Sequence, residues 1–454
     1  MTSLTSQQRK LVYLCGILIL LIPIIRLGLP ASGKDSPGGT LTRLRTKYEL
    51  GESDLGKVDP SGAAMNLVLL GMRGVAVNLL YTQFEKERDA KQWEEMRATT
   101  ESIVRLQPHF EKVWEMNGWN LAYNTSAEWD AVEDRYYYVK VGGLFLKRGV
   151  EQNRKSTHLQ YHVANVYQKK IGNADEAKYY RNYFLHDPDP KFENGPDPAF
   201  NPDIMDNYLV AKKEYIRACQ IEDTEHRPQH ILDRTLFRSM PARCQFDYAQ
   251  VLQKDGKFGE VTREAWLEAL SDWTSKYGQE VFSIPIGDLN NPVRFDIRLG
   301  MSRDDVKKEI ANPDDVVRVT DMVDRYRKMV NYYYWTTRGN CESEQTTAEA
   351  HRSLYEASQK YKSQELDKAL ELSLAGMTGF DKILNQPEYN ELKSEDTLVE
   401  ECLLGIRVWK GIQELGQLKI PNDYPLKWLE LEHANNTQLQ QNVERAYKRA
   451  FLTN

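Results

Sequence analysis

The feature that most constrains the fold is a succession of apolar residues at helical spacing, in segments separated by short turns that contain Pro or Gly. In one such segment, which ends before Pro108, the apolar residues are Trp93, Met96, Ile103 and Leu106. Side chains three or four residues apart line one face of a helix, and an apolar face must be buried against another element. A chain of 454 residues has room for several such pairs. The pattern therefore predicts a mainly α-helical protein of stacked helical hairpins.

Two of these hairpins resemble a degenerate tetratricopeptide repeat. Residues 113–121 match much of the signature W-x2-L-G-x2-Y, with Trp114 and Gly118 at the Trp and Gly positions and other residues at the Leu and Tyr positions. The small Gly allows the second helix of the hairpin to approach closely. The second hairpin turns at residues 172–173, and its apolar positions are Tyr161, Ala164, Tyr167, Ala177, Tyr180 and Phe184. Because the 34-residue period is loose, we expect an irregular, α-solenoid-like stack.

The helical pattern is interrupted by a predicted small α/β insert near residues 281–320. Residues 293–299 alternate strictly between apolar and polar, which is typical of a half-buried strand. Ser302 and Asp305 then form the capping signature of a short helix that ends before a proline. We expect a second strand at residues 316–319.

The N-terminal region carries an uninterrupted apolar run, residues 11–25, preceded by Arg9 and Lys10. Continued to residue 29, this segment approaches the ~20 residues that cross a membrane as a helix. We therefore predict a transmembrane anchor over residues 11–29; a cleaved signal sequence ending near residues 31–33 and a buried helix are the alternatives. The basic residues in front favour a cytoplasmic N-terminus, which predicts a single-pass protein of the inner (cytoplasmic) membrane with its body on the periplasmic side.

These patterns together predict a domain order along the chain. Residues 30–61 are rich in Gly, Ser and Pro and are expected to form a flexible linker. The predicted segments are a short tail (1–10), the anchor (11–29), the linker (30–61), a tetratricopeptide-like helical-repeat domain (62–280), the α/β insert (281–320) and a C-terminal helical domain (321–454).

Charge and motifs exclude several classes of function. The chain has 60 basic and 66 acidic residues, a net charge of −6, so it lacks the excess positive charge with which proteins neutralise nucleic-acid phosphates. Walker A, G-x-G-x-x-G, H-E-x-x-H and G-x-S-x-G motifs do not occur. We therefore predict no catalytic residues, no cofactor, no small-molecule substrate and no nucleic-acid partner, and expect that the protein is not an enzyme.

One set of residues has the chemistry of a zinc site, because neutral imidazoles and thiolates are zinc ligands. The set is Cys219, His226, His230 and Cys244. Its spacing matches no compact zinc motif, so a Cys219–Cys244 disulfide and unrelated core or loop residues are the alternatives. His158 and His162 lie four residues apart on one helix face and have the spacing of a metal-binding pair. We expect them to be packing or surface residues.

Two runs of aromatic residues are candidate protein-interaction surfaces, residues 136–138 and 332–335. Each helical residue turns by ~100°, so three consecutive side chains span about 200° of a helix. At least one residue of each run should therefore lie near the surface, with the others in the core. Tyr and Trp supply large, rigid contact area at interfaces. The candidates are Tyr136, Tyr137, Tyr138, Tyr332, Tyr333, Tyr334 and Trp335.

Several short motifs together resemble a known family. They lie at residues 71–76, 106–108, 113–124, 329–335 and 341–346. On these motifs the chain resembles the uncharacterised, membrane-anchored, tetratricopeptide-like proteins of planctomycete-type bacteria. The resemblance implies a helical-repeat envelope protein and offers no catalytic residue. Residues 299–313 separately resemble a Gly-Met-Ser plus helix motif of small outer-membrane lipoproteins that assist barrel assembly.

The predicted function is a membrane-anchored helical-repeat scaffold or adaptor that mediates protein–protein interactions in the bacterial cell envelope. Its partners would be other proteins, chiefly membrane or envelope components. One alternative is an exported enzyme or metal-binding protein with a site assembled from dispersed residues such as Cys219, His226 and His230. Another is an envelope-assembly factor, which depends on residues 300–302.

Overall fold

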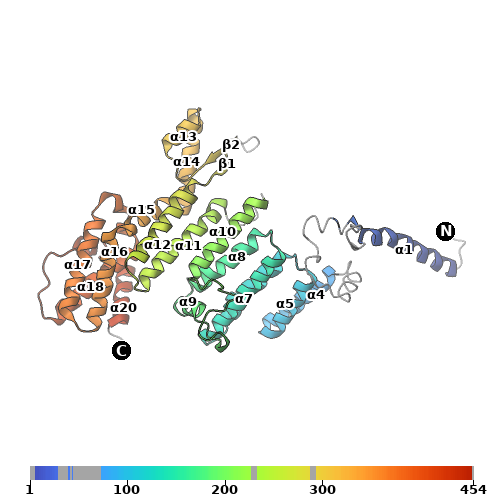
Figure 1. Ribbon diagram of the computed structural model, residues 1–454, viewed down its shortest axis with the longest axis horizontal. Coiled ribbons are helices and arrows are strands. Elements are labelled where there is room, and N and C mark those ends of the chain that lie inside the picture. Colours follow the sequence, from blue (N-terminus) through green and yellow to red (C-terminus); the bar gives the residue numbers. More distant parts are fainter. Residues whose placement is uncertain are drawn as a thin grey trace. The chain divides into compact units, whose positions relative to one another are not determined.

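The computed structural model describes residues 6–28, 39–40, 43, 73–225, 233–286 and 293–451. The chain divides into two compact units, Met1–Val113 and Trp114–Asn454. The described residues are mainly helical, and they include one sheet of two strands (Figure 1). The predicted mainly α class with a small β element is therefore confirmed.

The first unit contains α1 (Ser6–Gly28), α4 (Arg73–Asp89) and α5 (Trp93–Leu106). Helices α4 and α5 form a hairpin across a short turn in which Lys91 has a φ of 56°. The inner face of α5 buries Met96, Ile103 and Val104, in agreement with the helical spacing of its apolar residues.

The predicted membrane anchor over residues 11–29 is wrong. Among the described residues, no helix combines the length and the apolar character that crossing a membrane requires. The helix there, α1, has 23 residues, but its first turns are polar and Arg26 lies in its last turn. The uninterrupted apolar run, residues 11–25, spans about 22 Å as a helix, short of the ~30 Å hydrocarbon core. The predicted single-pass location in the inner membrane, with a periplasmic body, is wrong with it.

The N-terminal half of the second unit is a series of helices that pack against their neighbours in the chain. These elements are α6 (Glu111–Trp119, which begins in the first unit), η2 (Asn120–Thr125), α7 (Val132–Gln152), α8 (Thr157–Asn165), η3 (Val166–Ile171), α9 (Ala177–Leu185), η4 (Pro190–Phe192), α10 (Asn207–Glu225), α11 (Arg234–Lys254), α12 (Glu260–Ser271), η5 (Asp272–Lys276) and η6 (Tyr277–Gln279). Helix α7 contacts η2 and α8, α8 contacts α10, α10 contacts α11, and α11 contacts α12. Figure 1 shows α7, α8, α10, α11 and α12 side by side in a row.

The two predicted hairpins are formed by α6 and η2 with α7, and by α8 and η3 with α9. A Cβ added to Gly118 would lie 2.4 Å from Cγ of Leu146 on α7, so the close approach that the small residue was expected to allow is confirmed. In the second hairpin, α8 and η3 lead through a turn at Gly172 into α9. Its aromatic positions pack inward as expected, with Tyr161, Tyr167, Tyr180 and Phe184 all buried.

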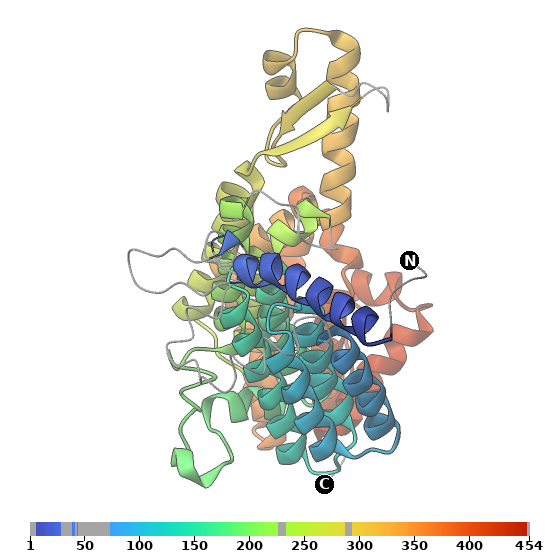
Figure 2. The same cartoon turned by 90° about the vertical axis from the view of Figure 1, so that its right-hand side faces the viewer.

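The insert contains strands β1 (Phe282–Ile286) and β2 (Val293–Ile297), which pair antiparallel with Phe282 opposite Ile297. Helix α13 (Arg303–Glu309) follows, and Ser302 and Asp305 form the predicted capping box at its start. The strand and the short helix expected from the sequence are thus confirmed. Figure 2 shows β1, β2, α13 and part of the next helix projecting as a lobe from the other helices of the second unit.

The second strand expected at residues 316–319 is wrong, because these residues belong to α14 (Pro313–Val330). The Asn312 side chain caps this helix, and Pro313 occupies its first turn, where a missing N–H costs nothing. Val316, Val319 and Val323 are buried at helical spacing. A short β-branched run is ambiguous between strand and helix, and the cap decides between them.

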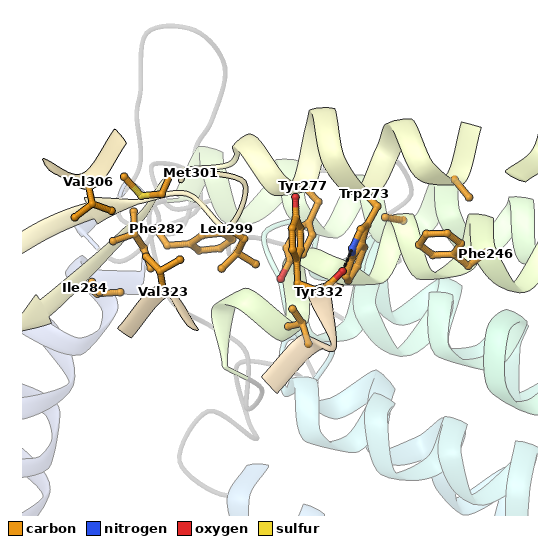
Figure 3. Packing of buried hydrophobic residues seen from close by; sticks show 14 of the residues in the cluster. Phe246, Trp273, Tyr277, Phe282, Ile284, Leu299, Met301, Val306, Val323 and Tyr332 are labelled. Carbon is orange, nitrogen blue, oxygen red and sulfur yellow. Dashed lines mark hydrogen bonds between the residues drawn. The ribbon is translucent and has the colours of Figure 1, made fainter. Parts of the chain in front are cut away.

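The lobe is joined to the helical row by one continuous core (Figure 3). Phe282, Leu299, Met301 and Val323 pack together at the lobe end, and the core continues through the rings of Tyr277, Tyr332 and Trp273 to Phe246. Trp273 Nε1 donates a hydrogen bond of 3.1 Å to the Tyr332 carbonyl oxygen. The insert therefore shares its core with α11 and α12.

The C-terminal part of the second unit is again helical. Its elements are α15 (Tyr332–Ser343), α16 (Gln345–Lys362), α17 (Leu366–Leu384), η7 (Pro387–Ser394), α18 (Asp396–Leu415), α19 (Lys427–Glu432) and α20 (Thr437–Phe451). Helix α17 contacts both α16 and α18, and α18 contacts α20. A separate apolar core lies among them, with Phe380, Ile406 and Trp409 almost completely buried.

Candidate functional site

The first aromatic run lies near the start of α7. Tyr136 and Tyr138 are buried, whereas Tyr137 is 45% exposed. Tyr136 packs against the rings of Tyr180 and Tyr183, and Tyr138 stacks on Trp129 with ring centroids 5.2 Å apart. The prediction that at least one residue of this run reaches the surface is therefore confirmed. Tyr136 and Tyr138 pack in the core.

The second run starts α15, after Asn331 with a left-handed φ of 55°. Tyr332 is buried, whereas Tyr333 is 52% exposed, and its hydroxyl accepts a 2.7 Å hydrogen bond from Arg327. Tyr334 donates a hydrogen bond to Glu395, and Trp335 stacks on Phe246 at 4.6 Å. Of the seven predicted interaction residues, Tyr137 and Tyr333 are the exposed ones.

The sequence interpretation missed Trp119 as a surface residue. Trp114, Asn117 and Gly118 occupy the buried side of α6, which leaves Met116 and Trp119 46% and 48% exposed on its outer side. The Trp119 ring stacks on Tyr123, with centroids 5.4 Å apart and planes at 16°. The sequence could have indicated this exposure. Trp119 lies three residues after Met116, which places both on one side of the helix, and it is outside the signature positions of the repeat.

The proposed Cys–His zinc set is only partly described. Cys219 is half-buried on α10 and Cys244 is buried on α11, and both are free thiols. His226 and His230 lie outside the described residues. Burial raises the pKa of Cys219 to about 12 and raises that of Cys244 well above its ordinary value. Without a metal both sulfurs are therefore protonated thiols at neutral pH, and a zinc ion would have to displace their protons.

Cys219 also borders a cavity of about 590 Å³ whose charged lining residues include Lys212, Arg234, Arg238 and Lys276. Their positive charge is largely compensated locally. Lys212 Nζ lies 2.6 Å from Asp272 Oδ2, and Arg238 Nε lies 2.8 Å from Glu222 Oε2. The cavity therefore offers no uncompensated charge that would favour a particular ligand.

His158 and His162 project from one face of α8, as their spacing predicts, and Glu115 of α6 joins them. The Nε2 atoms of the two histidines are 3.2 Å apart. Oε2 of Glu115 lies 2.9 Å from Nε2 of His158, and its Oε1 lies 3.4 Å from Nε2 of His162. The sequence could not identify Glu115, which is 43 residues before the first histidine and on another helix. These are the residues best suited to hold a metal ion in the described part of the chain.

A second cluster of charges lies between α15, α16 and α18. Nε2 of His351 lies 2.9 Å from Oε2 of Glu342, and its Nδ1 lies 2.7 Å from Oε1 of Glu401. Arg338 approaches the other Glu342 oxygen at 2.7 Å and Glu395 at 2.9 Å. The cluster faces a cavity of about 270 Å³. Since every charged member has an opposite charge beside it, the cluster is a closed ion-pair network.

Comparisons with known proteins give no functional assignment for these residues. No family model, no curated protein and no solved structure matches the chain.

Proposed function

We propose that this protein is a helical-repeat scaffold whose second unit binds other proteins. The observation that carries the proposal is a set of exposed aromatic side chains on helices of the second unit. Among the described residues of that unit they are Trp119 on α6, Tyr137 on α7, Tyr179 on α9, Tyr333 on α15 and Tyr355 on α16. Stacked helical hairpins offer extended surfaces that binding proteins commonly use, and exposed Trp and Tyr are enriched at the energetic centres of interfaces.

The chemistry of these residues favours a protein partner. Each ring combines a large apolar area with a polar atom, so it suits a contact that is dry in its centre and wet at its edge. The net charge of −6 disfavours nucleic acid as an alternative occupant of the surface. The tetratricopeptide-like signature at residues 113–121 supports the same interpretation.

Site-specific photocrosslinking in the native host tests the proposal. A photoreactive phenylalanine analogue is placed at Trp119, Tyr137 or Tyr333, and at the exposed Glu264 of α12 as a matched control. We expect one defined protein to crosslink from at least one aromatic position and not from Glu264. Substituting that aromatic residue by Ala should then weaken binding of the purified partner at least tenfold, as truncation of a central interface residue does.

Two results would contradict the scaffold. One is the absence of any reproducible crosslinked protein from all three aromatic positions. The other is an equal yield of the same protein from Glu264, which would indicate non-specific proximity. The alternative function, a metal-binding protein with a dispersed site, is supported by the Glu115, His158 and His162 cluster rather than by Cys219.

A further inference from the structure

Three side chains from two helices converge in the N-terminal half of the second unit. Ser156 caps α8, its Oγ accepting a hydrogen bond from the Leu159 N–H, and this fixes where the helix begins. His158 and His162 are therefore one helical turn apart on the same face. Glu115 reaches them from α6, and its carboxylate contacts both rings.

The three ligand atoms form a compact triangle. The separations are 3.2 Å between the two Nε2 atoms, 2.9 Å from Glu115 to His158 and 3.4 Å from Glu115 to His162. A tetrahedral metal ion with bonds of 2.0–2.1 Å holds its ligand atoms about 3.3 Å apart. The triangle thus already has the size of one face of a metal coordination shell. Glu115 and His162 are half-buried and His158 is buried.

The arrangement of donor atoms also suits a cation. The Glu115 carboxylate faces the Nε2 atoms of both histidines, and the two Nε2 atoms lie 3.2 Å from each other. A metal ion among the three atoms would be coordinated by both imidazole nitrogens and by the carboxylate at once.

We propose that Glu115, His158 and His162 bind one divalent transition-metal ion. Two imidazoles and one carboxylate suit Zn²⁺, Fe²⁺, Co²⁺ or Ni²⁺, whereas Mg²⁺ and Ca²⁺ prefer shells of oxygen alone. Three protein ligands are also the number found in zinc sites that keep a position for water or substrate. The bound ion would link α6 to α8, both of which are connected to α7 through packing or chain continuity.

The test uses the full chain, freed of metal with a chelator and titrated with Co²⁺ and with Zn²⁺. We expect one ion per chain, measured by elemental analysis and by the visible absorption of bound Co²⁺, which Zn²⁺ should displace. His158→Gln, His162→Gln and Glu115→Gln each keep the approximate side-chain volume and remove a ligand. Each should weaken binding by more than the 10- to 100-fold that loss of an outer-shell partner costs.

Two matched controls separate this site from others. His186→Gln removes an exposed histidine outside the cluster and should leave affinity unchanged. Cys219→Ser removes the thiol of the alternative metal set and should also leave it unchanged. A circular dichroism spectrum shows that each variant is folded; if a histidine variant unfolds, Glu115→Gln, whose side chain is less buried than that of His158, decides the question.

Wild-type affinity in folded Glu115→Gln would overturn the proposal, as would wild-type affinity in either folded histidine variant. So would the absence of stoichiometric Co²⁺ and Zn²⁺ binding by the wild-type chain. Loss of binding in Cys219→Ser alone would assign the metal to the other set and would equally overturn it. None of these results bears on the crosslinking test, because no ligand of the proposed ion is among the exposed aromatic residues.

Discussion

His351 is almost completely buried between two carboxylates, Glu342 and Glu401, on neighbouring helices. Burial by itself lowers the pKa of this imidazole, but the charges of Glu401 and Glu342 outweigh burial and raise the pKa to about 10. Burial likewise favours a neutral Glu342, yet Arg338 and His351 lower its pKa to about 2. The native state therefore holds His351 as an imidazolium at neutral pH, which an isolated histidine would not be.

This pKa predicts how stability depends on pH. The folded pKa of His351 lies above its unfolded value of about 6.5, so its contribution is complete below pH 6.5 and is lost as the pH rises towards 10. Between those values the free energy of unfolding should fall by up to about 1.4 kcal/mol per pH unit on account of this residue. Chemical denaturation at pH 6.5, 8 and 9.5, followed by circular dichroism, measures the slope.

The variant His351→Gln provides the comparison. It should be less stable than wild type by about 3 kcal/mol at pH 6.5, because it removes the cation between Glu401 and the buried Glu342 and leaves Glu342 with Arg338 but without its second cation. The difference between the two proteins should shrink as the pH rises. His186→Gln, at an exposed histidine, should keep the wild-type slope. A constant difference between wild type and His351→Gln from pH 6.5 to 9.5 would show that His351 is neutral in the folded state.

At the scale of elements, the contact of α7 with α6 and η2 depends on residues without side chains. A Cβ added to Gly142 would lie 2.7 Å from both the Ala122 nitrogen and the Gly118 carbonyl oxygen. These are backbone atoms, which cannot move without displacing a helix. A Cβ added to Gly118 would instead meet the flexible side chain of Leu146.

We therefore expect Gly142→Ala to destabilise the protein by about 1–3 kcal/mol through overpacking, even though Ala is the better helix former. Gly118→Ala should cost less, because the Leu146 side chain can adopt another rotamer. Thermal or chemical unfolding of both variants tests the order. Equal or greater stability of Gly142→Ala would mean that the two helices are not packed this closely.

At the scale of the whole second unit, buried apolar residues form separate clusters. One contains Trp266 and Trp273 of α12 and η5 together with the β-hairpin lobe. Another contains Phe380 and Ile406 of α17 and α18. Helices that pack mainly on their chain neighbours couple weakly to distant ones, so local opening need not spread along the unit.

This organisation predicts localised effects of core mutations. Ile406→Ala should cost about 2–5 kcal/mol locally and speed amide exchange in α16–α18 and α20, with little change in α7 and α8. Phe184→Ala, in the aromatic cluster with Tyr167 and Phe200, should have the opposite distribution. Hydrogen exchange with peptide-level mass spectrometry measures both. A uniform increase over the whole unit in either variant would show that it unfolds as one cooperative block.

Much of the fold followed from local patterns in the sequence. The helical hairpins near Trp114 and Tyr161, the strand at residues 293–297 and the capped helix after Ser302 depend on periodicity and caps within a few residues. The prediction that each aromatic run exposes at least one residue also held, because helix geometry alone requires it. The membrane anchor failed where a short apolar run was extended across Arg26 to reach a membrane's thickness.

The sequence by itself thus determined the helical class and the local elements, because hydrophobic periodicity and capping act between residues close in the chain. Only the tertiary structure decided which distant side chains meet. It brought Glu115 of α6 to His158 and His162 of α8, and it enclosed His351 between Glu342 and Glu401. Such contacts depend on how helices pack against one another, and the spacing of residues along a single helix does not specify its partner.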